Sequence, residues 1–234
     1  MKNKQIHLRN ASFFALAFVI LGYTVKFFQT SLAGFDSTIQ TAIRGNLSSG
    51  ATQFWTSITI LGNTVIILAI TLLVAAFFYF YKKWKIEAYF LLASFAAMGV
   101  ASTALKYVYQ RPRPSIQWLI DTIGYSFPSW HTASTMMIAG AIVIVLQQRM
   151  KKGLARTAVQ ALLVFISILV AISRIYIGVH YPTDIIGGWL LAITLLQAMY
   201  PFYDQKRFEW RFQSKQKYKI RATSWLLFCY FLSV

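Results

Sequence analysis

The sequence is poor in acidic residues and in cysteine, and both shortages narrow the kind of protein it encodes. It contains six aspartates and glutamates in total and one cysteine among 234 residues. A single cysteine, Cys229, excludes an internal disulfide framework, and because no histidine lies near it in the sequence we expect no catalytic role for it. The acidic residues are scattered, so the sequence predicts no carboxylate cluster to hold a magnesium ion.

Charged residues of either sign are also scarce, whereas hydrophobic residues are abundant. Charged residues make up 12% of the chain and hydrophobic residues 57%, and the mean hydropathy is +0.54. This composition argues against a soluble globule and indicates a polytopic membrane protein, because about 20 apolar residues span a bilayer. An all-α bundle of six transmembrane helices is predicted, with spans at Leu8–Phe28, Thr56–Tyr81, Ile86–Tyr107, His131–Leu146, Thr157–Ile177 and Asp184–Phe202.

The segment between the first two spans, Ser31–Trp55, is too polar to cross a bilayer. Its apolar residues Phe35, Ile39 and Ile43 recur at helical spacing, which favours a short helix in the membrane interface. A simple connector is the alternative. We expect the charges of Asp36 and Arg44, which are interleaved with the apolar residues, to be solvated or mutually compensating, and we expect neither residue to be catalytic.

Two parts of the chain differ in character. Residues 1–203 are predicted to form the six-span membrane domain, and residues 204–234 a basic, aromatic tail whose apolar ending is too short to span. The tail is expected to lie on the cytoplasmic surface or to pack on the bundle. The first span follows a positively charged start, but its apolar run exceeds the usual length of a signal-peptide core, so we interpret it as an uncleaved anchor.

The formal net charge of +17 is distributed in a way that points to a membrane and not to nucleic acid. Of the 23 lysines and arginines, 17 fall in the two termini and in the second and fourth connections between spans. By the positive-inside rule, both termini are therefore predicted to be cytoplasmic, with the basic surface facing anionic lipid headgroups. Most of the cations left on the opposite side lie in three polar clusters between residues 106 and 184.

The third of these clusters contains a candidate nucleophile. Pro182 suits the first position of a helix, which places His180 just outside that helix and Asp184 in its first turn. A carboxylate there can accept a proton from one imidazole nitrogen and so keep the other nitrogen unprotonated and nucleophilic. Arg174, at the end of the fifth span, is expected beside His180. The alternative is that His180 and Asp184 only cap the helix.

The second cluster is Pro128-Ser129-Trp130-His131. If Pro128 opens the fourth span, the amides of the next three residues lie at a helix amino terminus, which is a natural anion site. The Ser129 hydroxyl adds a donor, and His131 adds a second titratable group. A lone interfacial histidine is more often structural, but a second histidine on the same predicted side favours a functional pair.

The first cluster runs from Lys106 to Arg113-Pro114. Arg113 lies between two prolines, which restrict the backbone to a stiff, extended course. An arginine held in this way offers a planar fork to phosphate oxygens, and Lys106 adds a point charge. Snorkelling to the headgroup level would explain Lys106 or Arg111, but it explains Arg113 less well.

Together the three clusters resemble the signature of the type 2 phosphatidic acid phosphatase (lipid phosphate phosphatase) family, and size and charge are similar to those of its bacterial members. The matching pattern is Lys106, six residues, Arg113-Pro114; Pro128-Ser129-x-His131; and Ser173-Arg174, five residues, His180, three residues, Asp184. The chain departs from the family at Trp130, where glycine is usual. The Trp130 amide can still donate, but its indole must point away from the phosphate or line the substrate entrance.

The resemblance implies a hydrolase that forms a phosphohistidine on His180, with Asp184 orienting the nucleophile and His131 as general acid and base. It implies no metal and no cofactor. The residues expected to bind phosphate are Lys106, Arg113, Ser129, Trp130 and Arg174, with Arg111 as an auxiliary.

The substrate is expected to be a lipid with a terminal phosphate, handled at the outer face of the cell membrane. Phosphatidylglycerophosphate is the first choice, followed by undecaprenyl pyrophosphate and phosphatidic acid. Vanadate-dependent haloperoxidases share the phosphate-site pattern, but they are soluble and the six apolar spans argue against them. A non-enzymatic lipid-phosphate binder or transporter is the remaining alternative, although a degenerate family member would be expected to lose His180 or His131.

Overall fold

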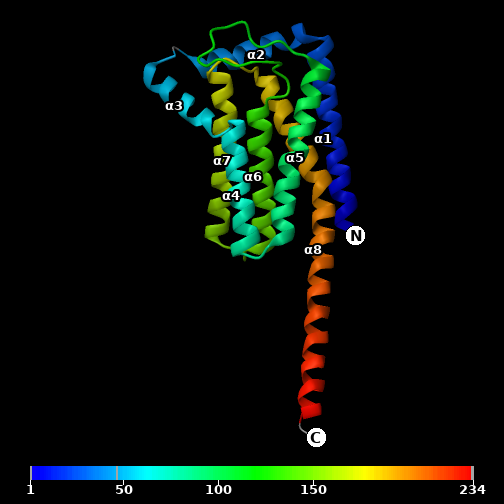
Figure 1. Cartoon of the computed structure of the whole chain (residues 1–234). Helices are drawn as coiled ribbons and strands as arrows, with labels where there is room; N and C mark the ends of the chain where they lie inside the picture. The colour runs from blue at the N-terminus through cyan, green and yellow to red at the C-terminus, as the bar shows by residue number, and fades with distance from the viewer. Residues whose placement is uncertain (1, 46, 233–234) are drawn as a thin grey trace.

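The structure, a computed structural model, describes the backbone of residues 2–45 and 47–232 and the side chains of residues 4–45 and 47–212. Every regular element among them is a helix, and Figure 1 shows most of them packed side by side as a bundle. The elements are α1 (Lys2–Phe27), α2 (Gln29–Arg44), α3 (Ser49–Ile60), α4 (Thr64–Ala76), the π-helix η1 (Phe77–Tyr81), α5 (Lys85–Tyr109), α6 (Trp130–Arg149), α7 (Leu154–Tyr176) and α8 (Pro182–Leu232).

Six helices in the described part of the chain are long and apolar enough to cross a membrane, which confirms the predicted fold class. They are α1, α4 with η1, α5, α6, α7 and the first part of α8. At 1.5 Å per residue, even the 18 residues of α4 and η1 approach the thickness of the hydrocarbon core. Helix α6 is the most enclosed span and packs against α4, α5, α7 and α8.

The predicted start of the second span at Thr56 is wrong. Thr56 lies in α3, which ends at Ile60, and the spanning helix begins only at Thr64. The turn between them is ended by Asn63, whose side chain accepts a hydrogen bond from the Val65 amide at 2.9 Å and so caps α4. The apolar residues on both sides of this break conceal it from hydropathy, which does not register the capped turn at Gly62-Asn63.

Two helices, α2 and α3, connect the first two spans, where one short interfacial helix was predicted. Figure 1 shows α2 lying across one end of the bundle. Phe35 is exposed, as expected for an interfacial helix, but Asp36 and Gln40 are buried. The expectation that Asp36 is solvated or pairs with Arg44 is therefore wrong, because the polar side of α2 faces protein.

Helix α8 continues without interruption through Pro201 to Leu232. Its amino-terminal part packs along α1 and α6, and Figure 1 shows its carboxyl-terminal part projecting beyond the bundle. The division of the chain at residues 203 and 204 stays a prediction. The expectations for the Trp225–Val234 ending and for Cys229 concern side chains outside the described residues.

Candidate active site

The residues of the three sequence clusters meet at the end of the bundle that α2 covers. Lys106 lies in the last turn of α5, and Arg174 in the last turn of α7. His131 lies in the first turn of α6, and Asp184 in the first turn of α8, which Pro182 opens as predicted. The connection between α5 and α6, residues 110–129, folds over this end of the bundle and carries Arg113 (Figure 1).

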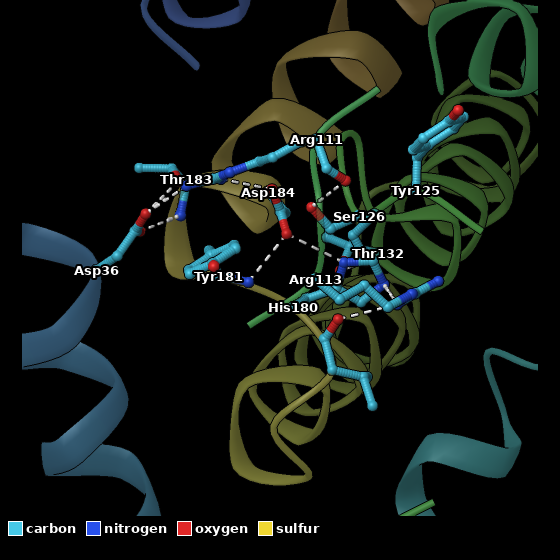
Figure 2. A network of polar contacts seen from close by, with 12 residues as sticks. Asp36, Arg111, Arg113, Tyr125, Ser126, Thr132, His180, Tyr181, Thr183 and Asp184 are labelled. Carbon is cyan, nitrogen blue, oxygen red and sulfur yellow. Dashed lines mark hydrogen bonds and ion pairs between the residues drawn. The ribbon is translucent and has the colours of Figure 1, made fainter. Parts of the chain in front are cut away.

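His180 and Asp184 form a buried pair. The Nδ1 atom of His180 lies 3.2 Å from Oδ2 of Asp184, and the same oxygen accepts a hydrogen bond from the Tyr181 amide at 2.9 Å. The two side chains are 2% and 0% exposed. With Nδ1 directed to the carboxylate, the Nε2 atom faces the other way, as Figure 2 shows. This is the orientation that a nucleophilic imidazole requires.

Arg113 is fixed beside Nε2 of His180, the imidazole nitrogen that does not face Asp184. Its Nη1 lies 3.3 Å from Nε2 of His180 and donates to the carbonyl of Val179 at 2.9 Å. Its Nε and Nη2 donate to the carbonyls of Gly124 and Ile123 at 2.9 and 3.0 Å. The guanidinium plane is therefore held by carbonyls from two segments of the chain, which fixes its positive charge next to His180.

The electrostatic surroundings keep His180 neutral. Burial lowers its pKa well below the ordinary value, and the positive charges of Arg174, Lys106 and Arg113 lower it further. Burial also lowers the pKa of the Arg113 guanidinium. A neutral imidazole retains a lone pair that can act as a nucleophile, and the surrounding cations favour a bound anion.

Lys106 and Arg174 both lie close enough to His180 for their charges to act on it. The Nζ atom of Lys106 donates to the carbonyl of Tyr125 at 2.5 Å. Arg174 is 2% exposed, and its Nη1 donates to Oγ1 of Thr59 in α3 at 2.8 Å. Its Nε is buried and has no hydrogen-bond partner among the described residues. An unpaired buried donor is costly, so this nitrogen is available to a polar ligand.

The beginning of α6 is joined directly to the beginning of α8. The Ser129 amide donates to the backbone carbonyl of Asp184 at 3.2 Å, so it is not one of the free amides expected there. The donors left at this turn are the Ser129 hydroxyl and the amides of Trp130 and His131, since first-turn amides lack intrahelical partners. His131 interacts electrostatically with His180. Gly188 allows this close approach, because a Cβ there would lie 3.1 Å from the Ser129 carbonyl.

Trp130 lines a groove on the side of the bundle. The indole ring lies edge-on to Phe95, with ring centroids 6.0 Å apart. The groove has a volume of about 420 Å³, lies between α4, α5 and α6, and reaches Lys106. Of the two orientations that the sequence left open for the indole, the structure has the one that lines an opening beside the site. Its walls are Thr64, Phe95, Gly99, Ser102, Thr103, Lys106 and Trp130.

Arg111 does not face the phosphate region that was expected for an auxiliary residue. Its Nη1 lies 2.6 Å from Oδ1 of Asp184, and its Nη2 lies 2.7 Å from Oδ2 of Asp36. Its side chain is 1% exposed, and Figure 2 shows it on the far side of Asp184 from His180. Both terminal nitrogens are thus occupied by carboxylates.

Three residues near the site were not identified from the sequence. Asp36 binds Arg111, Thr183 binds both Arg111 and Asp36, and Gly62 packs against the imidazole of His131. A signal existed only for Asp36, as one of six acidic residues in an apolar chain. Gly62 and Thr183 belong to no recognised spacing, since their roles depend on tertiary contacts.

Comparison with known proteins agrees with this geometry. Residues 87–208 match the PAP2 superfamily. The chain is 30% identical over 159 residues to phosphatidylglycerophosphatase B of Bacillus subtilis, which covers 67% of this chain and 77% of that protein. It is also 30% identical over 118 residues to the undecaprenyl-diphosphatase BcrC of the same organism, covering 47% and 56% of the two chains.

Solved structures show the same relationship. The crystal structure of a transmembrane PAP2-type phosphatidylglycerolphosphate phosphatase from Bacillus subtilis superposes with a TM-score of 0.75 at 26% identity, covering 84% of this chain and 96% of that one. A second structure, Aquifex aeolicus LpxE, shares the fold with a TM-score of 0.55. The chain therefore belongs to the PAP2 superfamily and is a membrane lipid phosphatase of that family.

Proposed function

We propose that His180 is the nucleophile of this phosphatase and that His131 is its general acid and base. The observation that carries the proposal is the arrangement around His180. Nδ1 is engaged by Asp184 and Nε2 lies beside the guanidinium of Arg113. A phosphate bound by that guanidinium would lie next to the atom that attacks it, and Lys106 and Arg174 would share the charge of its oxygens.

The first half of the proposed reaction transfers the phosphoryl group to the enzyme. The Nε2 lone pair of His180 forms a bond to phosphorus as the bond between phosphorus and the leaving oxygen breaks. His131 gives that oxygen a proton, so that an alcohol or a lipid phosphate departs. Asp184 stabilises the positive charge that develops on the imidazole of His180.

The second half returns the enzyme to its starting state. His131, now neutral, accepts a proton from a water molecule as the water oxygen attacks phosphorus. The bond between phosphorus and Nε2 breaks, inorganic phosphate is released, and His180 is neutral again. The proton held by His131 is the one that the next leaving group takes, so the cycle balances.

The substrate proposed first is phosphatidylglycerophosphate, by similarity to phosphatidylglycerophosphatase B. Undecaprenyl pyrophosphate is the second candidate, supported by the similarity to undecaprenyl-diphosphatases. Both carry a terminal phosphate on a lipid, and the groove that Trp130 lines leads from the side of the bundle to Lys106. A chain remaining in the bilayer would therefore reach the site laterally.

Phosphate release by the purified protein tests this proposal. The substrates are phosphatidylglycerophosphate, undecaprenyl pyrophosphate, phosphatidate and a water-soluble phosphoester, each with and without a chelator. The proposal expects the highest kcat/KM for phosphatidylglycerophosphate and no loss of rate with chelator. A higher kcat/KM for undecaprenyl pyrophosphate would make the second candidate the substrate, and binding of every lipid without release of phosphate would favour the non-enzymatic alternative.

We also propose that both termini are cytoplasmic, with the site facing outward and the basic surface in contact with anionic headgroups. The cation distribution supports this orientation. In a Cys229→Ser background, a cysteine at the exposed Gln117 should react with an impermeant reagent in intact cells, and a cysteine at Lys83 should not. The reverse pattern would invert the orientation.

A further inference from the structure

Asp36 is a buried carboxylate on α2, an element outside the three sequence clusters. It is 2% exposed, and its Oδ2 lies 2.7 Å from Nη2 of Arg111. The same guanidinium reaches Asp184 through Nη1 at 2.6 Å, and Asp184 in turn lies 3.2 Å from His180. Figure 2 shows this row of side chains, with Asp36 at one end and His180 at the other.

Further contacts fix the geometry at the end of the row where Asp36 lies. Oδ1 of Asp36 accepts a hydrogen bond from the Thr183 amide at 3.0 Å, and Oδ2 accepts one from the Thr183 hydroxyl at 2.8 Å. That hydroxyl also accepts from Nη1 of Arg111 at 2.7 Å. The Tyr181 ring lies over the guanidinium, with its centroid 3.9 Å from Cζ. Arg111 is thus held on several sides, in one orientation.

Two carboxylates share one guanidinium in this arrangement. Without Asp36, the full positive charge of Arg111 would act on Asp184, and both terminal nitrogens would be free to compete for its oxygens. Asp184 would then be a weaker partner for the imidazolium that develops on His180. With Asp36 present, Arg111 takes only Oδ1 of Asp184, and Oδ2 remains directed to His180 and the Tyr181 amide.

We propose that Asp36 is a positioning residue of the catalytic site, which acts through Arg111 on Asp184 and so ties the orientation of His180 to the interfacial helix α2. The proposal rests on the function proposed above, because it assumes that His180 is the nucleophile. Asp36 itself touches neither the substrate nor the reacting atoms.

Asp36→Asn is the direct test, because an asparagine can keep the acceptor for the Thr183 amide while it removes the negative charge. Asp121→Asn is the matched control, since Asp121 is an exposed carboxylate in the connection that covers the same end of the bundle. For each variant, steady-state kcat and KM are measured on the lipid phosphate that the wild type hydrolyses fastest. Rapid quenching gives the rate of phosphohistidine formation and the number of active sites.

Asp36→Asn is expected to lower kcat per active site and the rate of phosphohistidine formation by about ten- to a hundredfold, by analogy with the loss of a partner that orients a metal ligand. KM should stay within about twofold, since the phosphate-binding cations are untouched. Asp121→Asn should match the wild type. An Asp36→Asn enzyme with fewer active sites but a native rate at each would overturn the proposal, because Asp36 would then serve only stability.

Arg111→Lys provides the test if Asp36→Asn does not fold. A lysine keeps the charge but cannot offer two nitrogens to two carboxylates, so kcat should fall with KM unchanged, and a native kcat would overturn the proposal. The proposal for Asp36 and the proposal for His180 can fail separately. A native rate in His180→Asn contradicts the proposed nucleophile. An inactive His180→Asn together with a fully active Asp36→Asn contradicts only the positioning role proposed for Asp36.

Discussion

At the scale of single residues, the site depends on keeping a buried imidazole neutral among cations. His180 is 2% exposed, and the charges of Arg174, Lys106 and Arg113 act on it. Burial and these neighbouring charges each disfavour protonation of the imidazole, which would give it a positive charge. In the proposed mechanism, the cations that would hold a phosphate therefore also preserve the lone pair of His180, and Asp184 would stabilise the positive charge once the bond to phosphorus forms.

The pH dependence of turnover should reflect this environment. A lowered pKa means that His180 becomes protonated, and loses its lone pair, only at a pH well below the ordinary imidazole value of about 6.5. In a plot of kcat/KM against pH, the fall on the acid side that is caused by the enzyme should therefore have its midpoint below about 6.5. The measurement compares a phosphomonoester with a pyrophosphate, since a midpoint that moves between them belongs to the substrate. A midpoint that belongs to the enzyme and lies at or above about 6.5 would contradict the electrostatic account.

Trp130 is predicted to act on the lipid and not on the chemistry. Trp130→Gly removes an apolar wall of the groove, so kcat/KM for the preferred lipid should fall about tenfold. A fall of this size corresponds to the free energy of transferring part of one large apolar side chain from water. The rate with a water-soluble phosphoester should stay within about twofold. Trp130→Phe, which keeps an aromatic wall, serves as the control. An equal loss on both substrates would assign Trp130 to phosphate binding.

At the scale of elements, the turn between α3 and α4 sets the place of His131. A Cβ on Gly62 would lie 2.8 Å from Cδ2 of His131 and 2.8 Å from Cγ1 of Val170. Both distances are too short for ordinary contact, so one of the groups would have to move. The turn before the second span, which hydropathy missed, therefore also packs against His131, the proposed general acid.

Gly62→Ala should impair turnover through this contact. Overpacking of a tight site typically costs about 1–3 kcal/mol, and displacement of the imidazole should lower kcat by about tenfold. Gly50→Ala is the matched control, because nothing lies within 4 Å of a Cβ at that position. The measurement is kcat for the two variants side by side, and equal values would show that the α3–α4 turn does not position His131.

The sequence predicted the elements unevenly, and the reasons are physical. The long apolar runs located five of the six spanning helices to within a few residues at the end nearest the site, since bilayer thickness imposes their length. Periodicity in α2 identified its apolar residues, but it did not indicate that protein would cover the polar side that carries Asp36. The fixed spacings predicted the His180 and Asp184 contact, because His180 lies just before a helix that starts at Pro182.

At the scale of the whole molecule, the two ends of the bundle carry separate polar networks. The site occupies one end, and Glu87 of α5 lies at the other, fully buried. Its Oε1 lies 2.6 Å from Nη2 of Arg149 in α6 and 3.4 Å from Nε of Arg207 in α8. The hydroxyl of Tyr203 donates to the same oxygen at 3.3 Å. These contacts join three spans far from the catalytic residues.

Loss of the Glu87 charge should therefore affect stability and not chemistry. Glu87→Gln leaves Arg149 and Arg207 without their carboxylate, which should cost about 2–3 kcal/mol, less than breaking a fully buried pair because Arg149 is partly exposed. Thermal unfolding in detergent should show a lower midpoint, with kcat at low temperature within about twofold of the wild type. Glu209→Gln is the control, because the Glu209 carboxylate belongs to an exposed ion pair. A large fall in kcat at unchanged stability would contradict the separation of the two ends.

The central claim is that His180 carries the phosphoryl group, and rapid quenching with a lipid substrate labelled at its terminal phosphate tests it most directly. The account predicts an acid-labile, alkali-stable label that forms before phosphate is released and maps to the peptide containing His180. His180→Asn should give neither label nor turnover. A His180→Asn enzyme that releases phosphate at the native rate, or a label on another residue, would contradict the account.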